Sequence, residues 1–333
     1  MSFEVEIREW TEGKNWNSLV LENPFTTIYH SSEYARMMKK SFGLKPLFFI
    51  LKENGKQVGG ALVFEKTAIR IPVLSKFSKL YFSYAPPFAN LDNSKEDEAA
   101  VKFLIKKITE YGKNNFIASI NLWTTPYWNE PSVFEENSFK EKKLQNVVLD
   151  LRKSLDEIKK EIKKEAKKNV KKAEASGLVV REGNDSDLQE FYKHYESHHK
   201  ELGLPIFPFD YFKLIFEFII QEKKGEFFVA EKEGKFAAGI MVSTFNNRLY
   251  EMAVASNVEF MDLRPNDLLK MNVVEFGHEN GFDVFDLSNI AVEGNEKQMG
   301  VNRFKLKWGN VVSYNEYKKT AFLRGFLWKL LGR

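Results

Sequence analysis

The chain has 333 residues, of which 43% are hydrophobic and 29% charged, and its net charge is +4. This length predicts about two domains, and the composition is that of a globular protein with enough apolar material for buried cores. Because the sequence contains no cysteine, it excludes disulfide bonds, zinc–thiolate sites, iron–sulfur clusters and thiol nucleophiles.

In the first half of the chain, the pattern predicts strands mixed with helices. Residues 31–39 begin with a serine cap and have apolar residues at helical spacing, so we expect a helix that carries Arg36 and Lys39 within one turn. The pair Asn54-Gly55 separates two apolar runs, over 47–51 and 58–64, and predicts a β-hairpin. The other predicted elements are strands over residues 3–8, 80–84, 116–122 and near 147–149, and helices over residues 16–21 and 96–111.

The second half begins with the most basic element of the chain. Residues 154–157 form a capping box, and apolar residues continue at helical spacing to Val170, so we expect one helix that ends at Gly177. Lysines recur in pairs every four residues between Lys159 and Lys172. These lysines could bind the phosphates of a tRNA. Glutamates interrupt the series, and alternating charge on a helix is also typical of a solvated surface.

The order of elements in the second half repeats that of the first. The predicted elements are a strand over 178–181, helices over 185–202 and 209–221, a three-stranded meander over 226–254, a helix over 265–279 and a buried strand over 284–287. This repetition favours two copies of one α/β unit with mixed sheets. We therefore predict domains over residues 1–150 and 151–319, followed by an amphipathic helix over residues 320–333.

Near the C-terminus, residues 300–309 place one lysine, Lys305, between Phe304 and Trp308. The segment stops at Gly309, so we expect a helix that ends there, before the next strand. Beside two aromatic residues the ammonium would be buried in a low dielectric, where a fixed positive charge can stabilise an oxyanion or a phosphate. Alternatively, Phe304 and Trp308 are core contacts on one helix face and the basic residues around them are solvated.

Five segments between residues 150 and 317 form an ordered set. They are residues 169–178, 203–208 followed by Tyr211 and Phe212, 264–266, 281–287, and 303–305 with Trp308 and Gly309. Together they resemble the FemABX family of aminoacyl and peptidyl transferases, whose members consist of two GNAT-like domains. The first half of the chain matches the family more weakly, through residues 29–34 and 84–87.

The resemblance implies an enzyme that transfers an acyl or aminoacyl group to an amine, with aminoacyl-tRNA as the donor. Lys305 then matches the family lysine that neutralises the tetrahedral intermediate, in which negative charge builds up on oxygen. Phe304 would wall the site, Tyr250 could donate a hydrogen bond, and Tyr211 would line the substrate groove.

The general base and the contacts to the acceptor are less defined. Glu251 or Asp286 could remove a proton from the incoming ammonium, but either could instead be a structural partner of a basic residue. Arg36 or Lys39 falls where some members place a cation near the phosphates of the acceptor, although surface charge on a helix explains the same residues.

Two departures from the family pattern leave the acceptor open. Thr125-Pro126 stands where some members have an acidic residue before proline, and Phe207 replaces an arginine four residues before Tyr211. Both departures weaken the assignment of a nucleotide-linked muropeptide as the acceptor. We expect an amine-bearing acceptor, such as a cell-envelope precursor linked to a lipid or a nucleotide.

No cofactor or metal site is expected. CoA-dependent GNAT enzymes cradle pyrophosphate with a loop of the form Gln/Arg-x-x-Gly-x-Gly/Ala at a helix N-terminus, and the sequence contains no such loop. This absence favours a donor other than acetyl-CoA, with an acyl-CoA-dependent GNAT N-acetyltransferase as the alternative enzyme. His194, His198 and His199 have the spacing of metal ligands on a helix, but without a third ligand cluster we expect surface histidines.

The non-catalytic alternative is a scaffold of the same fold that docks on a membrane. It would use the lysine-rich helix and the basic, aromatic run from Phe322 to Leu331, which could lie in a membrane interface or close the core of the second domain. No secretory signal or membrane-spanning run is visible, so we expect a cytoplasmic protein, with peripheral contact to the inner membrane face through this run.

Overall fold

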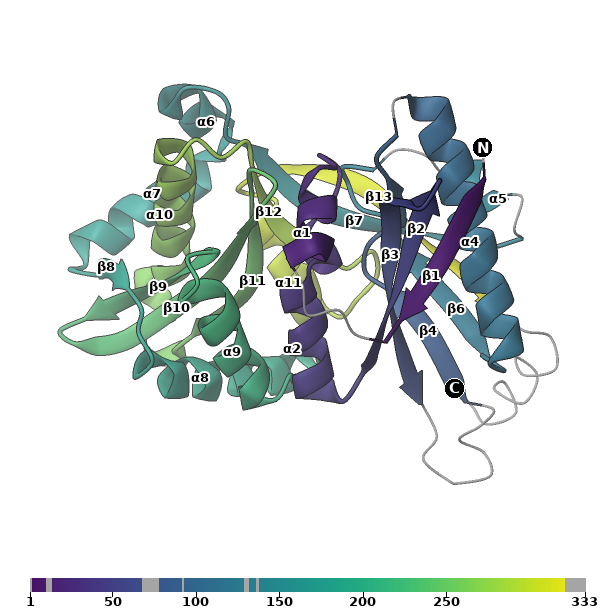
Figure 1. Ribbon diagram of the computed structural model, residues 1–333. Helices are drawn as coiled ribbons and strands as arrows, with labels where there is room; N and C mark the ends of the chain where they lie inside the picture. Colours follow the sequence, from purple (N-terminus) through teal and green to yellow (C-terminus); the bar gives the residue numbers. More distant parts are fainter. Residues whose placement is uncertain are drawn as a thin grey trace. The chain divides into compact units, whose positions relative to one another are not determined.

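The computed structural model describes residues 2–9, 14–67, 78–91, 93–128, 132–135 and 138–320. These residues form two compact units (Figure 1). Unit 1 contains the chain up to Lys143 and again from Tyr314 on, and unit 2 contains Leu144–Ser313. Both units have a mixed sheet with helices packed on it, which confirms the predicted α/β class. The predicted C-terminal helix, with the run from Phe322 to Leu331, lies outside the described residues.

In unit 1 the strands lie in the order β1-β2-β3-β4-β6-β13, and β5 pairs with β3. The strands are β1 (Phe3–Arg8), β2 (Lys45–Glu53), β3 (Lys56–Thr67), β4 (Lys79–Ser83), β5 (Phe88–Ala89), β6 (Ser119–Trp123) and β13 (Asn310–Thr320). The helices are α1 (Lys14–Leu21), η1 (Ile28–His30), α2 (Ser32–Phe42), α4 (Ser94–Asn114) and α5 (Ser132–Glu135). Successive side chains of β2 face opposite sides of the sheet: Phe48 packs on Trp16 of α1, and Phe49 packs on Tyr111 of α4.

In unit 2 the strands lie in the order β7-β12-β11-β10-β9-β8. The strands are β7 (Lys140–Asp150), β8 (Val179–Glu182), β9 (Gly225–Lys232), β10 (Lys235–Phe245), β11 (Arg248–Ser256) and β12 (Val284–Asn289). The helices are α6 (Leu155–Glu161), α7 (Lys164–Ala175), α8 (Asp187–Leu202), α9 (Phe209–Ile215), η2 (Phe216–Ile220), η3 (Val258–Leu263), α10 (Pro265–Glu279) and α11 (Glu296–Lys305).

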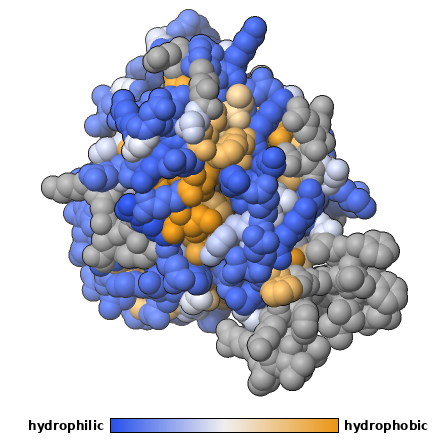
Figure 2. Space-filling view, turned by 45° about the vertical axis from the view of Figure 1, so that its right-hand side comes forward, coloured by the Kyte–Doolittle hydropathy of each residue, from blue (hydrophilic) through white to orange (hydrophobic). Residues whose placement is uncertain are grey.

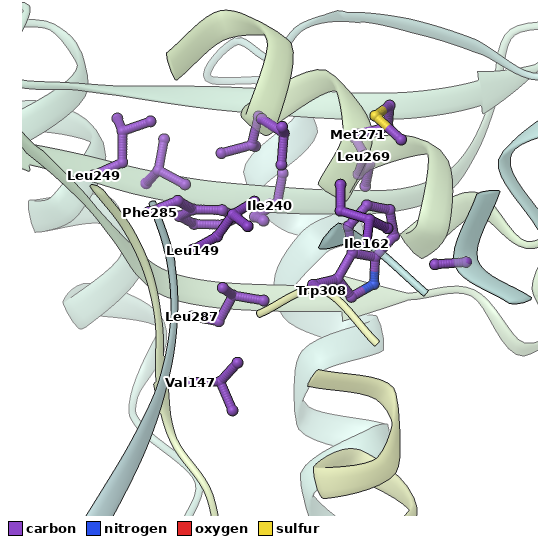
Figure 3. Packing of buried hydrophobic residues seen from close by; sticks show 14 of the residues in the cluster. Val147, Leu149, Ile162, Ile240, Leu249, Leu269, Met271, Phe285, Leu287 and Trp308 are labelled. Atoms are coloured by element: carbon purple, nitrogen blue, oxygen red, sulfur yellow. The ribbon is translucent and has the colours of Figure 1, made fainter. Parts of the chain in front are cut away.

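Two layers of helices cover the two faces of the sheet in unit 2. Helices α6, α7 and α10 bury their apolar residues against one face, in the core cluster that includes Ile162, Phe285 and Trp308 (Figure 3). Helices α8 and α9 cover the other face, where Phe191 of α8 lies 5.5 Å from Phe227 of β9 between ring centroids. Figure 2 shows that hydrophilic residues cover most of one face of the molecule, as the composition predicts.

The chain passes from unit 1 to unit 2 within β7 and returns within β13, so the units differ from the predicted domains at both boundaries. Residues 144–150 belong to unit 2, where Leu149 of β7 pairs with Phe285 of β12. Residues 314–319 belong to unit 1, where Tyr317 of β13 pairs with Leu122 of β6. Both pairings join segments far apart in the sequence, and local patterns do not reveal them.

The lysine-rich segment forms two helices instead of the one predicted. The backbone is extended at Ile162 (ψ 132°), between α6 and α7. The break buries the Ile162 side chain in the core and lets the Lys163 N–H donate to the Lys307 carbonyl oxygen at 2.9 Å. These tertiary contacts replace the helical hydrogen bonds lost at the break, which explains why the regular apolar spacing misled the prediction.

Candidate active site

The parallel pairing of β11 with β12 ends before either strand does. Residues 248–250 of β11 pair with residues 284–286 of β12, whereas β11 continues to Ser256 and β12 to Asn289. The pairing of β10 with β11 also shifts register between Met241 and Val242, and Ser288 of β12 has a left-handed backbone (φ 67°). Such irregularities bend the strand that carries them and end regular pairing. The end of β12 is therefore accessible to a side chain from another element.

That side chain is Lys305, the last residue of α11. It is only 9% exposed, and its Nζ donates a hydrogen bond to the Asn289 carbonyl oxygen at 3.1 Å. Glu251 Oε1 lies 3.7 Å from the same nitrogen, which is beyond hydrogen-bonding distance. Burial lowers the pKa of Lys305 to about 8, and the carboxylate of Asp286 acts in the opposite direction. Lys305 is therefore buried, and the alternative in which it is solvated is wrong.

A second lysine, which the sequence interpretation missed, lies in the same place. Lys270 of α10 has a side chain that is 2% exposed and forms an ion pair with Glu251 Oε2 of β11, whose side chain is 9% exposed. Its Nζ also lies 5.6 Å from the centre of the Phe285 ring. The only sequence signal for this burial is that Lys270 precedes Val273 and Val274 by one helical turn, on the buried face of α10.

The residues on either side of Lys305 fix its backbone. Phe304 packs against the core, and Lys307 places its Nζ 4.8 Å from the centre of the Phe304 ring. The same Nζ lies 3.6 Å from Asp267 and 3.3 Å from Glu165, so Lys307 is held rather than solvated. Trp308 is fully buried in the core cluster. Both interpretations of this element are thus partly right, because Trp308 is a core contact and Lys305 is buried beside it.

Gly309 is required for close approach and not for helix termination. Helix α11 ends at Lys305 with a right-handed cap at Leu306, and Gly309 is not among the residues with positive φ. A Cβ atom at Gly309 would lie 2.3 Å from the carbonyl oxygen of Val148 in β7. The prediction that this glycine stops the helix is wrong, because the glycine instead lets the chain pass against β7.

The two predicted tyrosines lie in unit 2 on the side of α8 and α9. Tyr250 is buried beside Glu251 in β11, and because strand side chains alternate, it leaves the strand on the face opposite to Glu251. Burial raises the pKa of Tyr250. Tyr211 is buried in α9 with its ring 4.9 Å from that of Phe207. Lys305 therefore lies near Glu251, on the face of β11 opposite to the one that Tyr250 occupies.

The remaining candidates have other surroundings. Arg36 and Lys39 are exposed on α2 in unit 1, within one turn as predicted. Asp286 is buried and accepts hydrogen bonds from Asn146 Nδ2 at 2.9 and 3.1 Å and from the Ser288 N–H at 2.8 Å. Among the described residues, no three His, Asp or Glu side chains are grouped as metal ligands.

Comparison with known proteins identifies the class of fold. Residues 160–306 match the family model of an acetyltransferase (GNAT) domain. The crystal structure of FemX superimposes with a TM-score of 0.78 at 14% identity, over 98% of this chain and 100% of that chain. The C-terminal domain of a putative lysylphosphatidylglycerol synthetase from Agrobacterium fabrum does so with a TM-score of 0.61 at 14% identity, over 95% of this chain and 94% of that chain.

A tandem GNAT protein from the clavulanic acid biosynthesis pathway has a TM-score of 0.58 at 10% identity, over 95% of this chain and 98% of that chain. A comparison with curated proteins found no match. These results confirm the predicted fold class, tandem GNAT-like domains, and the predicted class of enzyme, an acyltransferase. Residues 160–306 thus form a GNAT acyltransferase domain, in a chain with the FemX fold that resembles the FemABX family.

Proposed function

We propose that the chain is an N-acyltransferase that moves an aminoacyl group from a tRNA-linked ester to an amine acceptor, with Lys305 stabilising the oxyanion. The observation that carries this proposal is the buried Lys305 ammonium where the pairing of β11 with β12 ends. An ammonium has three N–H donors, so Lys305 can bind the Asn289 carbonyl oxygen and still donate to a substrate oxygen.

The proposed step requires only a fixed cation and a proton acceptor. The nitrogen of the acceptor amine attacks the ester carbonyl carbon, a C–N bond forms, and the carbonyl electron pair moves to oxygen. The tetrahedral intermediate then collapses and the C–O bond to the ribose breaks, while the proton that leaves the amine passes to the departing ribose oxygen, which leaves as a hydroxyl group. A preorganised cation in a low dielectric stabilises the negative oxygen by several kcal/mol, about 3 in comparable sites.

The rate of acyl transfer is expected to fall as the pH rises through about 8, because burial lowers the pKa of Lys305 to about 8. Only the protonated ammonium can stabilise an oxyanion, so kcat/KM, which reports the ionisation of the free enzyme, should decline by up to about tenfold per pH unit above that value. A pH–rate profile measures this decline. Lys305→Arg is the control, because its guanidinium stays protonated and should remove the decline. A wild-type rate that keeps rising to high pH would contradict the role.

The row of lysines on α7 supports an RNA-linked donor. Lys164, Lys168, Lys171 and Lys172 are exposed, and the helical period places them on one face, opposite the buried apolar residues of α7. Exposed lysines at this spacing neutralise phosphates of a nucleic acid, with binding that weakens as salt rises.

The glutamates that interrupt this segment in the sequence are engaged elsewhere. Glu157 completes the cap at the start of α6, Glu161 pairs with Lys153, and Glu165 lies 3.3 Å from Lys307. Glu157 and Glu161 lie on α6, outside α7, whereas Glu165 lies in the first turn of α7, one helical turn before Lys168. The basic face of α7 is therefore interrupted only near its start by these three glutamates.

Reversing the charge of Lys168 and Lys171 is expected to weaken the binding of tRNA by about tenfold or more and to reduce the slope of log K against log salt concentration by about 2. Filter binding over a range of salt concentrations measures both quantities. The control is Lys142→Glu with Lys143→Glu, two exposed lysines of β7, which changes the net charge equally. An equal loss of tRNA affinity in both double variants would show that the lysines of α7 do not contact the tRNA specifically.

An acyl-CoA donor is the second candidate, favoured by the description of the matching family model as an acetyltransferase domain. Against it, the first turn of α10 already holds a buried carboxylate, Asp267, which accepts a hydrogen bond from Asn169 Nδ2 at 3.3 Å. A pyrophosphate at that helix N-terminus would be repelled. Assays with aminoacyl-tRNA and with acyl-CoA, together with calorimetry of CoA binding, distinguish the donors.

The acceptor in this proposal is an amine of a cell-envelope precursor. The neighbour named as a lysylphosphatidylglycerol synthetase has, by its name, a lipid product that carries an amino acid, which supports a lipid-linked acceptor. We propose that Arg36 and Lys39 bind acceptor phosphates and that the run from Phe322 to Leu331 contacts the membrane surface. No helix in the described part of the chain is long and apolar enough to span a membrane.

A further inference from the structure

Three buried charged side chains from three elements form one cluster in unit 2. Glu251 comes from β11, Lys270 from α10 and Lys305 from α11. The two lysines are each at least nine-tenths buried and share the single carboxylate. With these three groups ionised, they carry one net positive charge in a region of low dielectric, which the nearby buried carboxylate of Asp286 opposes.

The two lysines are not equivalent partners of Glu251. Lys270 contacts Oε2 directly, whereas Lys305 stays 3.7 Å from Oε1 and donates to the neutral Asn289 carbonyl oxygen at 3.1 Å. When two opposite charges are in direct contact, each cancels most of the electric field of the other. An ammonium group that is hydrogen-bonded to a neutral carbonyl oxygen keeps its net charge. The net positive charge of the cluster therefore resides on Lys305.

We propose that Lys270 is a positioning residue of the acyl-transfer site: it neutralises Glu251 and so keeps Lys305 from pairing with that carboxylate. This inference rests on the proposed function, in which Lys305 stabilises the oxyanion. Without Lys270, the buried Glu251 carboxylate would have Lys305 as its nearest cation. Lys305 would then turn from Asn289 to Glu251, and its charge would be cancelled before the substrate arrives.

Burial and the charged groups that face Lys305 together determine its ionisation. These groups are Glu251 on β11, Asp286 on β12 and Lys270 on α10. Burial and the Lys305 ammonium lower the pKa of Lys270, while contact with Glu251 favours its protonated form. Loss of Lys270 both removes a like charge and frees a carboxylate, and an experiment must separate these two effects.

A double-mutant cycle read by NMR separates them. The signals of 13Cε-labelled lysines are titrated in the wild type, Lys270→Met, Glu251→Gln and the double variant, with Lys305→Met used to assign Lys305. Lys270→Met is expected to raise the pKa of Lys305 by about one to two pH units. In the Glu251→Gln background the same change should produce less than about half that shift, because the carboxylate is absent.

Equal shifts in both backgrounds, or no shift in either, would overturn the proposal, because Lys270 would then act by repulsion alone or not at all. Lys270→Arg keeps the positive charge, so the pKa of Lys305 and the pH–rate profile should both remain as in the wild type. If Lys270→Met does not fold, Lys270→Gln gives the same comparison. The titration needs no substrate, so it tests Lys270 even if an active Lys305→Met enzyme were to disprove the proposed function.

Discussion

Lys305→Met is expected to lower kcat for acyl transfer by about 10²–10³-fold, the usual loss when one oxyanion-stabilising group is removed. Methionine is unbranched and nearly as long as lysine, so the substitution keeps most of the packing and removes the charge together with the hydrogen bond to the Asn289 carbonyl oxygen. Because Glu251 keeps its ion pair with Lys270, the fold should survive the change. Single-turnover kinetics, together with circular dichroism and thermal unfolding, measure the two quantities separately.

Arg303→Met is the matched control for this prediction. Arg303 lies on the same helix, two residues before Lys305, but its side chain is exposed and pairs with the exposed Glu296. The same loss of one positive charge at this position should leave kcat unchanged. Unchanged turnover in Lys305→Met, or an equal loss in both variants, would contradict the role of Lys305.

Glu251→Ala should have the largest effect on stability, because it leaves two buried lysines without their carboxylate. Removing one partner of a buried ion pair costs about 3–5 kcal/mol of unfolding free energy. The loss should be smaller at high pH. The folded variant would bind its lysine protons more weakly than the unfolded chain does, so the unfolding free energy rises as the pH rises through the folded pKa values. Urea titrations at neutral and at alkaline pH measure both effects.

Glu165→Ala is the control for the stability measurement. Its carboxylate also pairs with a lysine, Lys307, but the Glu165 side chain is 70% exposed. Exposed ion pairs contribute only about 0–1 kcal/mol, so this variant should differ little from the wild type. A similarly small loss in Glu251→Ala, or a loss that does not change with pH, would show that the cluster is not held by its charges.

The sequence predicts well those elements that local chemistry determines. Asn54 and Gly55 both adopt the left-handed backbone that their hairpin turn requires, and Ser31 accepts the cap hydrogen bond from the Tyr34 N–H at 3.1 Å. Prediction from the sequence fails where contacts between distant parts of the chain determine the local structure. The break at Ile162 depends on a hydrogen bond to Lys307, 144 positions along the chain from Lys163.

The candidate site likewise contains one residue that could be predicted from the sequence and one that could not. Lys305 could be found because it lies between aromatic residues in one short segment, and because that segment resembles a family. Lys270 could not be found, since its partner Glu251 lies on another element and its own neighbours on α10 are ordinary core residues. From the sequence alone, Glu251 could equally be a general base or the partner of a lysine. The ion pair with Lys270 now favours the role of a lysine partner.

The path of the chain between the units bears on how the protein is made. Unit 2 is one uninterrupted segment, so it can fold as soon as its last residue, Ser313, has been translated. The larger part of unit 1 precedes unit 2 in the chain, but β6 receives its partner β13 only after the whole of unit 2 has been translated. The nascent N-terminal unit therefore waits with an incomplete sheet, and this interval is when it most needs protection from pairing with other chains.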